Sequence, residues 1–262
     1  LGRLEAIPEL VERTDLKFPA FRPRIPERLR QSENIFSTIA EGDILLHHPY
    51  ESFAPFIEML HQAASDPQVV SIRQTLYRTG AESGVANALL KAARAGKDVL
   101  VVIELRARFD EAANIELANA LQAAGAQVVY GVVGHKTHAK MCMIIRREGR
   151  RLVRYVHLGT GNYHERTARA YTDYGLLSSD QDLGQDVQKI FQQIAALGKA
   201  GKLRAILQSP FTLYSGVLEL IEIQRQKALQ GEPALIQAKM NALTEPSAVS
   251  YTHLRAHETL PY

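Results

Sequence analysis

Three apolar segments alternate with two amphipathic segments between residues 69 and 133, and this alternation limits the folds open to the chain. The apolar segments VVSIRQTLYR, KDVLVVIEL and AQVVYGVV are rich in β-branched residues and predict strands. The two segments between them have helical spacing and end at Gly96 and Gly125. Strand, helix, strand, helix, strand in this order predicts a parallel sheet covered by helices, so the expected class is α/β.

The pattern changes after residue 137, where two strands follow one another directly. Residues 138–147 (HAKMCMIIRR) and 151–159 (RLVRYVHLG) predict a hairpin that turns at Glu148–Gly149. The segment GTGNYHERTAR then predicts a loop.

Weaker patterns flank this central region. Ser32 is a candidate cap for a short helix at 33–42. The other expected elements are a strand at 44–50, a helix at 51–64, a strand at 171–178 and a helix at 183–198, and, in a second unit, a strand at 206–210, a helix at 211–231 and a strand at 234–243.

The composition is that of an ordinary soluble globular protein. Apolar residues make up 46% and charged residues 23%, and a net charge of +3 is too small to indicate a nucleic-acid partner. No apolar run approaches the ~20 residues that a membrane-crossing helix needs. Cys142 is the sole cysteine, so an internal disulfide cannot form, and a reducing compartment such as the cytoplasm is expected.

The clearest chemical signal is His138-x-Lys140. Residues two apart on a strand face the same way, so the imidazole and the ammonium should project side by side. The hairpin should bring Gly159–Asn162 (GTGN) back beside them, so that Thr160 and Asn162 converge with the pair. An imidazole nucleophile, an ammonium, a hydroxyl and an amide suit the transfer of a phosphoryl group. The alternative is a lone histidine on a strand near a flexible turn.

Arginines form a second constellation. Arg78 follows the first of the central strands, and Arg108 follows the second. The carboxyl ends of parallel strands share one edge, where open α/β sheets bind ligands, so these two side chains should be neighbours. Guanidinium groups match the geometry of phosphate. The alternative is that they are solvated or pair with Glu104, Asp110 and Glu111.

Other residues carry weaker signals. His157 is interpreted as a structural histidine, and His47 and His48 as packing at a strand end. Tyr171 can stack on a base or cover the core. The chain has no Cys/His metal pattern, so any divalent ion is expected to be Mg²⁺ carried by nucleotide phosphates.

Five segments, in this order, resemble the long form of polyphosphate kinase, which phosphorylates itself on a histidine: LLHHPYESF, LYRTG, ELRARFDEAANI, KTHAKM and YVHLGTGNYHERTARAYTDYGLL. The resemblance runs from about Phe18 to Thr244. It implies a C-terminal half built from two phospholipase-D-like domains. Their HxK signature and GSxN-like turn correspond to His138-x-Lys140 and to Gly159–Asn162.

The resemblance also implies roles for single residues. His138 would become phosphorylated, Arg78 and Arg108 would associate with phosphate and the magnesium site, and Tyr171 would contact the nucleotide. The implied reaction is the reversible transfer of the γ-phosphate of ATP to inorganic polyphosphate through phosphohistidine, with Mg²⁺ as cofactor. ATP, ADP and polyphosphate would be the partners, and nucleic acid would not. Family members are homo-oligomers, and some associate peripherally with the inner membrane.

The resemblance divides the chain into four parts. Residues 1–31 would end a head or middle domain, and 32–203 would form the first phospholipase-D-like catalytic domain, with a mostly parallel sheet. Residues 204–246 would be the truncated start of a second such domain. Residues 247–262 are expected to be a disordered, non-native tail, because SYTHLRAHET resembles translated adapter sequence. Such a fragment is expected to be inactive alone.

Two other functions stay open. A phospholipase-D-like phosphodiesterase or nuclease would share the HxK motif, but those enzymes usually carry an acidic residue five positions after the lysine, where this chain has Ile145. They also usually need two HxK motifs, and this chain has one. The other alternative is a non-catalytic, anion-binding fragment.

Overall fold

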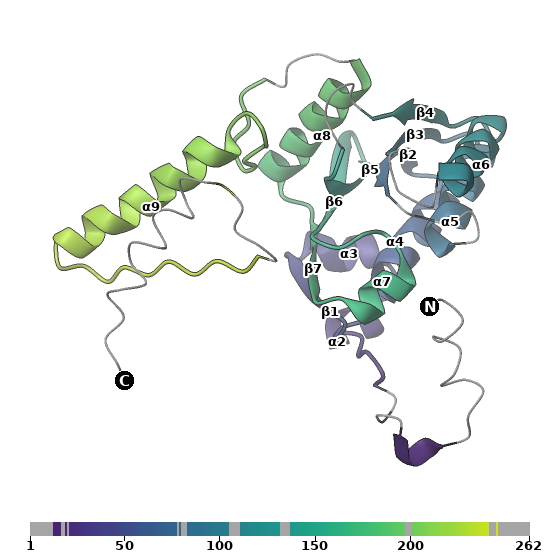
Figure 1. Ribbon diagram of the computed structural model, residues 1–262. Coiled ribbons are helices and arrows are strands. Elements are labelled where there is room, and N and C mark those ends of the chain that lie inside the picture. The colour runs from purple at the N-terminus through teal and green to yellow at the C-terminus, as the bar shows by residue number, and fades with distance from the viewer. Residues whose placement is uncertain are drawn as a thin grey trace. The chain divides into compact units, whose positions relative to one another are not determined.

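The computed structural model describes residues 13–16, 19, 21–77, 79, 83–104, 111–131, 137–196, 201–240 and 245. The chain divides into two compact units, residues 1–206 and residues 207–262. The first unit is a sheet flanked by helices, which confirms the predicted α/β class (Figure 1).

A seven-stranded sheet forms the centre of the first unit, as far as the structure describes it. Its order is β1-β7-β6-β5-β2-β3-β4. The strands are β1 (Ile44–His48), β2 (Val69–Leu76), β3 (Asp98–Ile103), β4 (Gln127–Tyr130), β5 (Lys140–Glu148), β6 (Arg151–Gly159) and β7 (Asp173–Ser178).

The expectation of a mostly parallel sheet is wrong. Only β2 with β3 and β3 with β4 pair in parallel, whereas the other described neighbours are antiparallel. The parallel pairs are those joined by crossover helices, as the sequence predicts. The predicted hairpin β5–β6 is confirmed, but it belongs to the same sheet, where β5 pairs with β2. On its other side β6 pairs with β7, and β7 pairs with β1. Strands joined by a tight turn are necessarily antiparallel.

Helices cover both faces of this sheet. The described helices of the first unit are η2 (Thr14–Leu16, a 3₁₀-helix), α2 (Glu27–Arg30), α3 (Ile35–Ala40), α4 (Ala54–Ser65), α5 (Gly84–Arg94), α6 (Glu111–Ala123), α7 (Glu165–Ala170) and α8 (Gln181–Ala196). The helix α7 lies where the sequence predicts only a loop.

Strand β3 shows why its sequence is an unbroken apolar run. Val99, Val101 and Ile103 belong to the larger core cluster, which includes residues of α3, α4, α5 and α6. Leu100 and Val102 belong to the smaller cluster, which includes residues of α8. Successive side chains of a strand point to opposite faces, so a strand covered on both faces needs apolar residues at every position.

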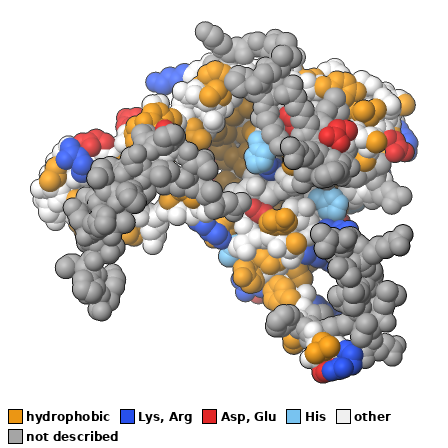
Figure 2. All heavy atoms as spheres, in the orientation of Figure 1, with side chains coloured by type: hydrophobic (Ala, Val, Ile, Leu, Met, Phe, Trp, Pro, Cys, Tyr) orange, Lys and Arg blue, Asp and Glu red, His pale blue; other side chains and the backbone are white. Residues whose placement is uncertain are grey.

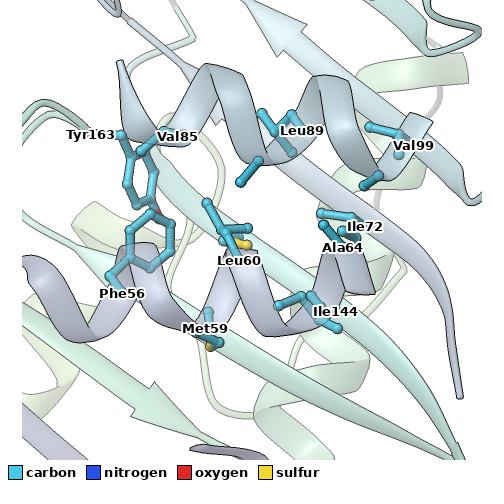
Figure 3. Packing of buried hydrophobic residues seen from close by; sticks show 14 of the residues in the cluster. Phe56, Met59, Leu60, Ala64, Ile72, Val85, Leu89, Val99, Ile144 and Tyr163 are labelled. Atoms are coloured by element: carbon cyan, nitrogen blue, oxygen red, sulfur yellow. The ribbon is translucent and has the colours of Figure 1, made fainter. Parts of the chain in front are cut away.

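Helices α4 and α5 pack together over the sheet (Figure 3). Phe56 and Leu60 of α4 and Leu89 of α5 are fully buried. The ring of Tyr163 stacks on Phe56 with 4.7 Å between ring centroids. Tyr163 directly follows the GTGN segment, so the larger core cluster anchors that segment.

The cap of α3 is Asn34, and not Ser32 as the sequence suggested. Its side chain accepts hydrogen bonds from the backbone N–H groups of Phe36 (3.0 Å) and Ser37 (3.4 Å).

We expect Asn34→Ala to lower the free energy of unfolding by about 1 kcal/mol, measured by urea denaturation. The matched control is Asn87→Ala on an exposed face of α5, which should not destabilise the protein, because alanine is the better helix former there.

The second unit contains α9 (Leu213–Leu229), close to the predicted long helix, and none of its residues is buried. Both apolar and charged side chains lie on its visible surface (Figure 2). The predicted strands at 206–210 and 234–243 are wrong wherever the structure describes them. A strand needs a partner for its backbone groups, and the described part of this unit offers none. The remainder of the second segment, 241–243, lies outside the described residues.

Two further expectations concern the ends of the chain and the membrane. The predicted tail at 247–262 lies outside the described residues. Among the described helices, none combines the length and the apolar character needed to cross a membrane.

Candidate active site

Several strands begin or end at one edge of the sheet, and the candidate site lies there. Lys140, the first residue of β5, pairs with Gly159, the last residue of β6. Gly159 pairs in turn with Gly175 of β7. The parallel strands β2 and β3 end at the same edge. The hairpin thus brings the start of the GTGN segment beside Lys140, as predicted, whereas the convergence of the Thr160 and Asn162 side chains with His138 and Lys140 stays a prediction.

His138 and Lys140 touch, although not in the predicted way. His138 lies two residues before β5 instead of on the strand, and it is exposed. Lys140 is buried, and its Nζ lies 3.0 Å from His138 Nε2 and donates to the backbone carbonyl of His138 at 2.7 Å. The Tyr77 ring lies near both groups, 5.7 Å from Nζ and edge-on to the imidazole.

This contact bears on the chemistry of the imidazole. An ammonium group has only donors, so a hydrogen bond from Lys140 Nζ to Nε2 requires the ring tautomer that has its lone pair on Nε2. A neutral imidazole with an accessible lone pair is the form that can act as a nucleophile.

The GTGN segment is held by Asp173, the first residue of β7. The Thr160 hydroxyl donates to Asp173 Oδ1 (2.8 Å) and accepts from the backbone N–H of Tyr174 (2.9 Å). A Cβ atom at Gly161 would collide with the Asp173 carboxyl group, so a larger residue at this position would require that carboxylate to move. Asn162 follows in the same segment and is partly exposed.

The other predicted site residues have different outcomes. Tyr171 ends α7 and is 62% exposed, so it does not cover the core. Arg78 and Arg108 lie outside the described residues, and their shared phosphate site stays a prediction. The described residues Tyr77 and Glu104, which follow β2 and β3, lie at the expected edge.

Two buried histidines, His48 and His157, lie next to each other beside the site. Nothing in the sequence indicated that they would be neighbours. His48 Nδ1 lies 2.8 Å from the Glu51 carbonyl, and His157 Nδ1 lies 2.9 Å from the Tyr163 hydroxyl. Neither Nε2 atom has a hydrogen-bond partner among the described residues. A Cβ at Gly175 would lie 2.6 Å from Nε2 of His157 and 3.2 Å from Nε2 of His48. The imidazole rings of His48 and His157 therefore both lie against Gly175, and they leave no room for a side chain at that position.

His157 should make the protein sensitive to acid. Burial, reinforced by the neighbouring His48, lowers the pKa of His157 from 6.5 to about 3. Because the folded pKa lies below the unfolded one, stability is complete above the unfolded pKa and is lost as the pH falls from there toward the folded pKa. One proton accounts for up to about 1.4 kcal/mol per pH unit. We expect His157→Gln to flatten this loss in denaturation curves recorded from pH 7 to pH 4. Above pH 7 the free energies of unfolding of the two proteins should change with pH in the same way. If the free energy of unfolding of His157→Gln falls as steeply below pH 7 as that of the wild type, another group causes the acid sensitivity.

No group of three or more His, Cys, Asp or Glu side chains in the described part of the chain could hold a metal ion. The ammonium of Lys140 beside His138 is a group that can bind an anionic substrate.

Comparisons with known proteins identify the family of the chain. The family described as "Polyphosphate kinase C-terminal domain 1" matches residues 34–200. A polyphosphate kinase of Xylella fastidiosa (strain 9a5c) is 57% identical over 249 residues, which are 95% of this chain and 35% of that protein. The crystal structure of polyphosphate kinase from Porphyromonas gingivalis superposes with a TM-score of 0.81 at 31% identity, covering 90% of this chain and 39% of that one.

The chain belongs to the polyphosphate kinase family. It spans about a third of the length of the curated relatives that it matches. The resemblance drawn from the five sequence segments is thus confirmed.

Proposed function

We propose that the full-length protein transfers the γ-phosphate of ATP to inorganic polyphosphate, reversibly, through a phosphohistidine at His138. The observation that carries the proposal is the 3.0 Å contact between Lys140 Nζ and His138 Nε2. It keeps the exposed imidazole of His138 beside a cation at the sheet edge to which the GTGN segment returns.

The proposed reaction has two displacements at phosphorus. The Nε2 lone pair of His138 attacks the γ-phosphorus, the bond to the bridging oxygen of ADP breaks, and ADP leaves. A terminal oxygen of polyphosphate then attacks the phosphohistidine, and the Nε2–P bond breaks. Lys140 would move from Nε2 to an oxygen of the incoming phosphoryl group and neutralise its charge.

Other residues would hold the substrates. Asn162 and Thr160 would lie beside the reacting phosphate, Tyr171 would contact the nucleotide, and Arg78 and Arg108 would bind its phosphates. Mg²⁺ would be held by those phosphates, because the described residues offer no ligand set of their own, and it would offset charge on the transferring group.

The test uses a hybrid enzyme, in which only the matching part of this chain replaces the 249 corresponding residues of the Xylella fastidiosa polyphosphate kinase. After incubation with γ-labelled ATP and denaturation, the hybrid should retain label that is lost in acid and kept in alkali. Label that survives acid, or an absence of label together with normal synthesis of polyphosphate, would contradict the phosphohistidine.

The phosphodiesterase alternative is less well supported. Ile145 packs against the smaller core cluster at the position where the acidic residue of phospholipases would lie. Turnover of bis-p-nitrophenyl phosphate by the hybrid, without polyphosphate synthesis, would favour that alternative.

Replacing either arginine should weaken phosphate binding without unfolding the protein. Loss of one charge-assisted contact to phosphate raises the barrier by roughly 1.5–3 kcal/mol, so kcat/KM of Arg78→Ala and Arg108→Ala should fall accordingly. The lysine variants should recover only part of the activity, because an ammonium cannot form the paired contacts of a guanidinium. Unchanged kinetics in both alanine variants would remove these residues from the site.

A cytoplasmic location, peripheral membrane association and homo-oligomeric assembly are proposed for the full-length protein. The division of the chain at residues 31, 203 and 246 and the inactivity of the fragment alone likewise stay predictions.

A further inference from the structure

The segment that carries His138 and Lys140 begins where the regular ladder between β2 and β5 stops. The last backbone pair of that ladder joins Gln74 to Cys142. Beyond this pair, the side chain of Thr75 makes the hydrogen bonds to the backbone of the neighbouring segment. Its hydroxyl accepts from the backbone N–H of Met141 (2.9 Å) and donates to the carbonyl of Ala139 (2.8 Å). Thr75 is only 3% exposed, so these bonds are shielded from water.

The other end of the segment is held by Glu104. Its Oε2 accepts from the backbone N–H of Thr137 (2.8 Å), and the residue is 5% exposed. Glu104 is itself fixed, because its N–H donates to the Leu76 carbonyl (3.2 Å) and its carbonyl accepts from the Asn114 side chain (3.4 Å).

We propose that Thr75 and Glu104 are positioning residues for the phosphoryl transfer proposed above. Their hydrogen bonds hold the backbone at residues 137, 139 and 141, and so flank both His138 and Lys140. Thr75 lies on β2 and Glu104 directly follows the neighbouring parallel strand β3, so the two side chains tie the reactive segment to the parallel part of the sheet. Neither residue contacts the substrate in this proposal, which rests on the proposed role of His138.

A positioning role predicts a loss of rate without a loss of substrate binding. A displacement of the nucleophile by about 1 Å lowers the rate by about 100-fold. In the hybrid enzyme, Thr75→Val keeps the shape of the side chain and removes the hydroxyl. We expect its single-turnover labelling rate to fall about 10- to 100-fold, while KM for ATP changes less than about twofold.

Conservative variants supply the rescue. Thr75→Ser keeps the hydroxyl, and Glu104→Gln keeps an acceptor oxygen, so both should label at close to the wild-type rate. Glu104→Met removes the acceptor and should behave like Thr75→Val. The matched control is Thr38→Val. Thr38 lies in α3, away from the site, and its buried hydroxyl donates a hydrogen bond to the hydroxyl of Ser32. The rate of this variant per folded molecule should not change.

The outcomes separate this proposal from the proposed function. Wild-type labelling rates in Thr75→Val and Glu104→Met would overturn the positioning role. So would a fall in rate that matches the loss of folded protein. If His138→Ala still labels, the proposed function fails instead.

A second measurement needs no turnover. In the 262-residue chain, the Met141 amide should exchange with solvent about fivefold faster in Thr75→Val, as expected for the loss of a hydrogen bond of about 1 kcal/mol. Unchanged exchange at Met141 would overturn the role of Thr75 even if the hybrid proved inactive.

Discussion

Replacing His138 by alanine in the hybrid enzyme should abolish acid-labile labelling and the synthesis of polyphosphate together. No other group can replace the nucleophile of a two-step transfer, so the loss should be complete instead of partial. His138 is exposed and lies before β5, so the change should leave the free energy of unfolding within about 0.5 kcal/mol of wild type. Labelled peptides and polyphosphate length provide the two readouts.

The control for this experiment is His61→Ala, on α4. It removes another imidazole that is not fully buried, away from the sheet edge, and should label normally. If the His138→Ala hybrid labels as well as the wild type, the nucleophile lies elsewhere and the proposed mechanism fails.

Lys140→Met should have the next largest effect, a fall of about 10²- to 10³-fold in the labelling rate. This is the usual loss when one preorganised donor to a developing charge is removed. Methionine keeps a straight, apolar side chain in the buried space beside Tyr77 and loses both the charge and the contact with His138 Nε2. Rates from rapid-quench experiments at saturating ATP would measure the effect on chemistry.

Lys91→Met is the matched control. Lys91 also holds a short polar contact, 2.8 Å to Ser65, but it lies on α5 away from the site. Its rate should equal that of the wild type. A Lys140→Met rate within threefold of wild type would show that Lys140 only supports the fold.

Local pattern was enough to predict much of this structure. The β-branched runs gave β2, β3 and β4, the glycines at 96 and 125 gave the ends of two helices, and the short turn at Gly149 gave the hairpin. The hairpin register then placed the GTGN segment beside Lys140. Each of these features depends on residues that are near one another in the sequence.

What the sequence did not predict depends on distant residues. The sheet is mixed because β5 pairs antiparallel with β2, more than sixty residues away in the sequence, and β1 adds a further antiparallel pair with β7 across more than a hundred residues. No periodicity predicts such pairings. The same holds for His48 and His157 above Gly175, for Asp173 beside Gly161, and for Thr75 and Glu104 at the ends of the reactive segment. Single polar residues in apolar strands were the only signal, and many buried residues give that signal without any role in a site.

The pairing of β1 with β7 has a consequence for the order of folding. Strand β1 touches the sheet through β7 alone, as far as the described residues show, and β7 is the last strand of the unit to be synthesised. The hairpin β5–β6 can close as soon as it is made, because its contacts are local, whereas β1 must wait for a partner that is distant in sequence. Ile44 and Leu46 therefore stay without their strand partners on the ribosome until residue 178 has emerged. Among the described strands of this unit, the first in the sequence therefore depends on the last for its pairing.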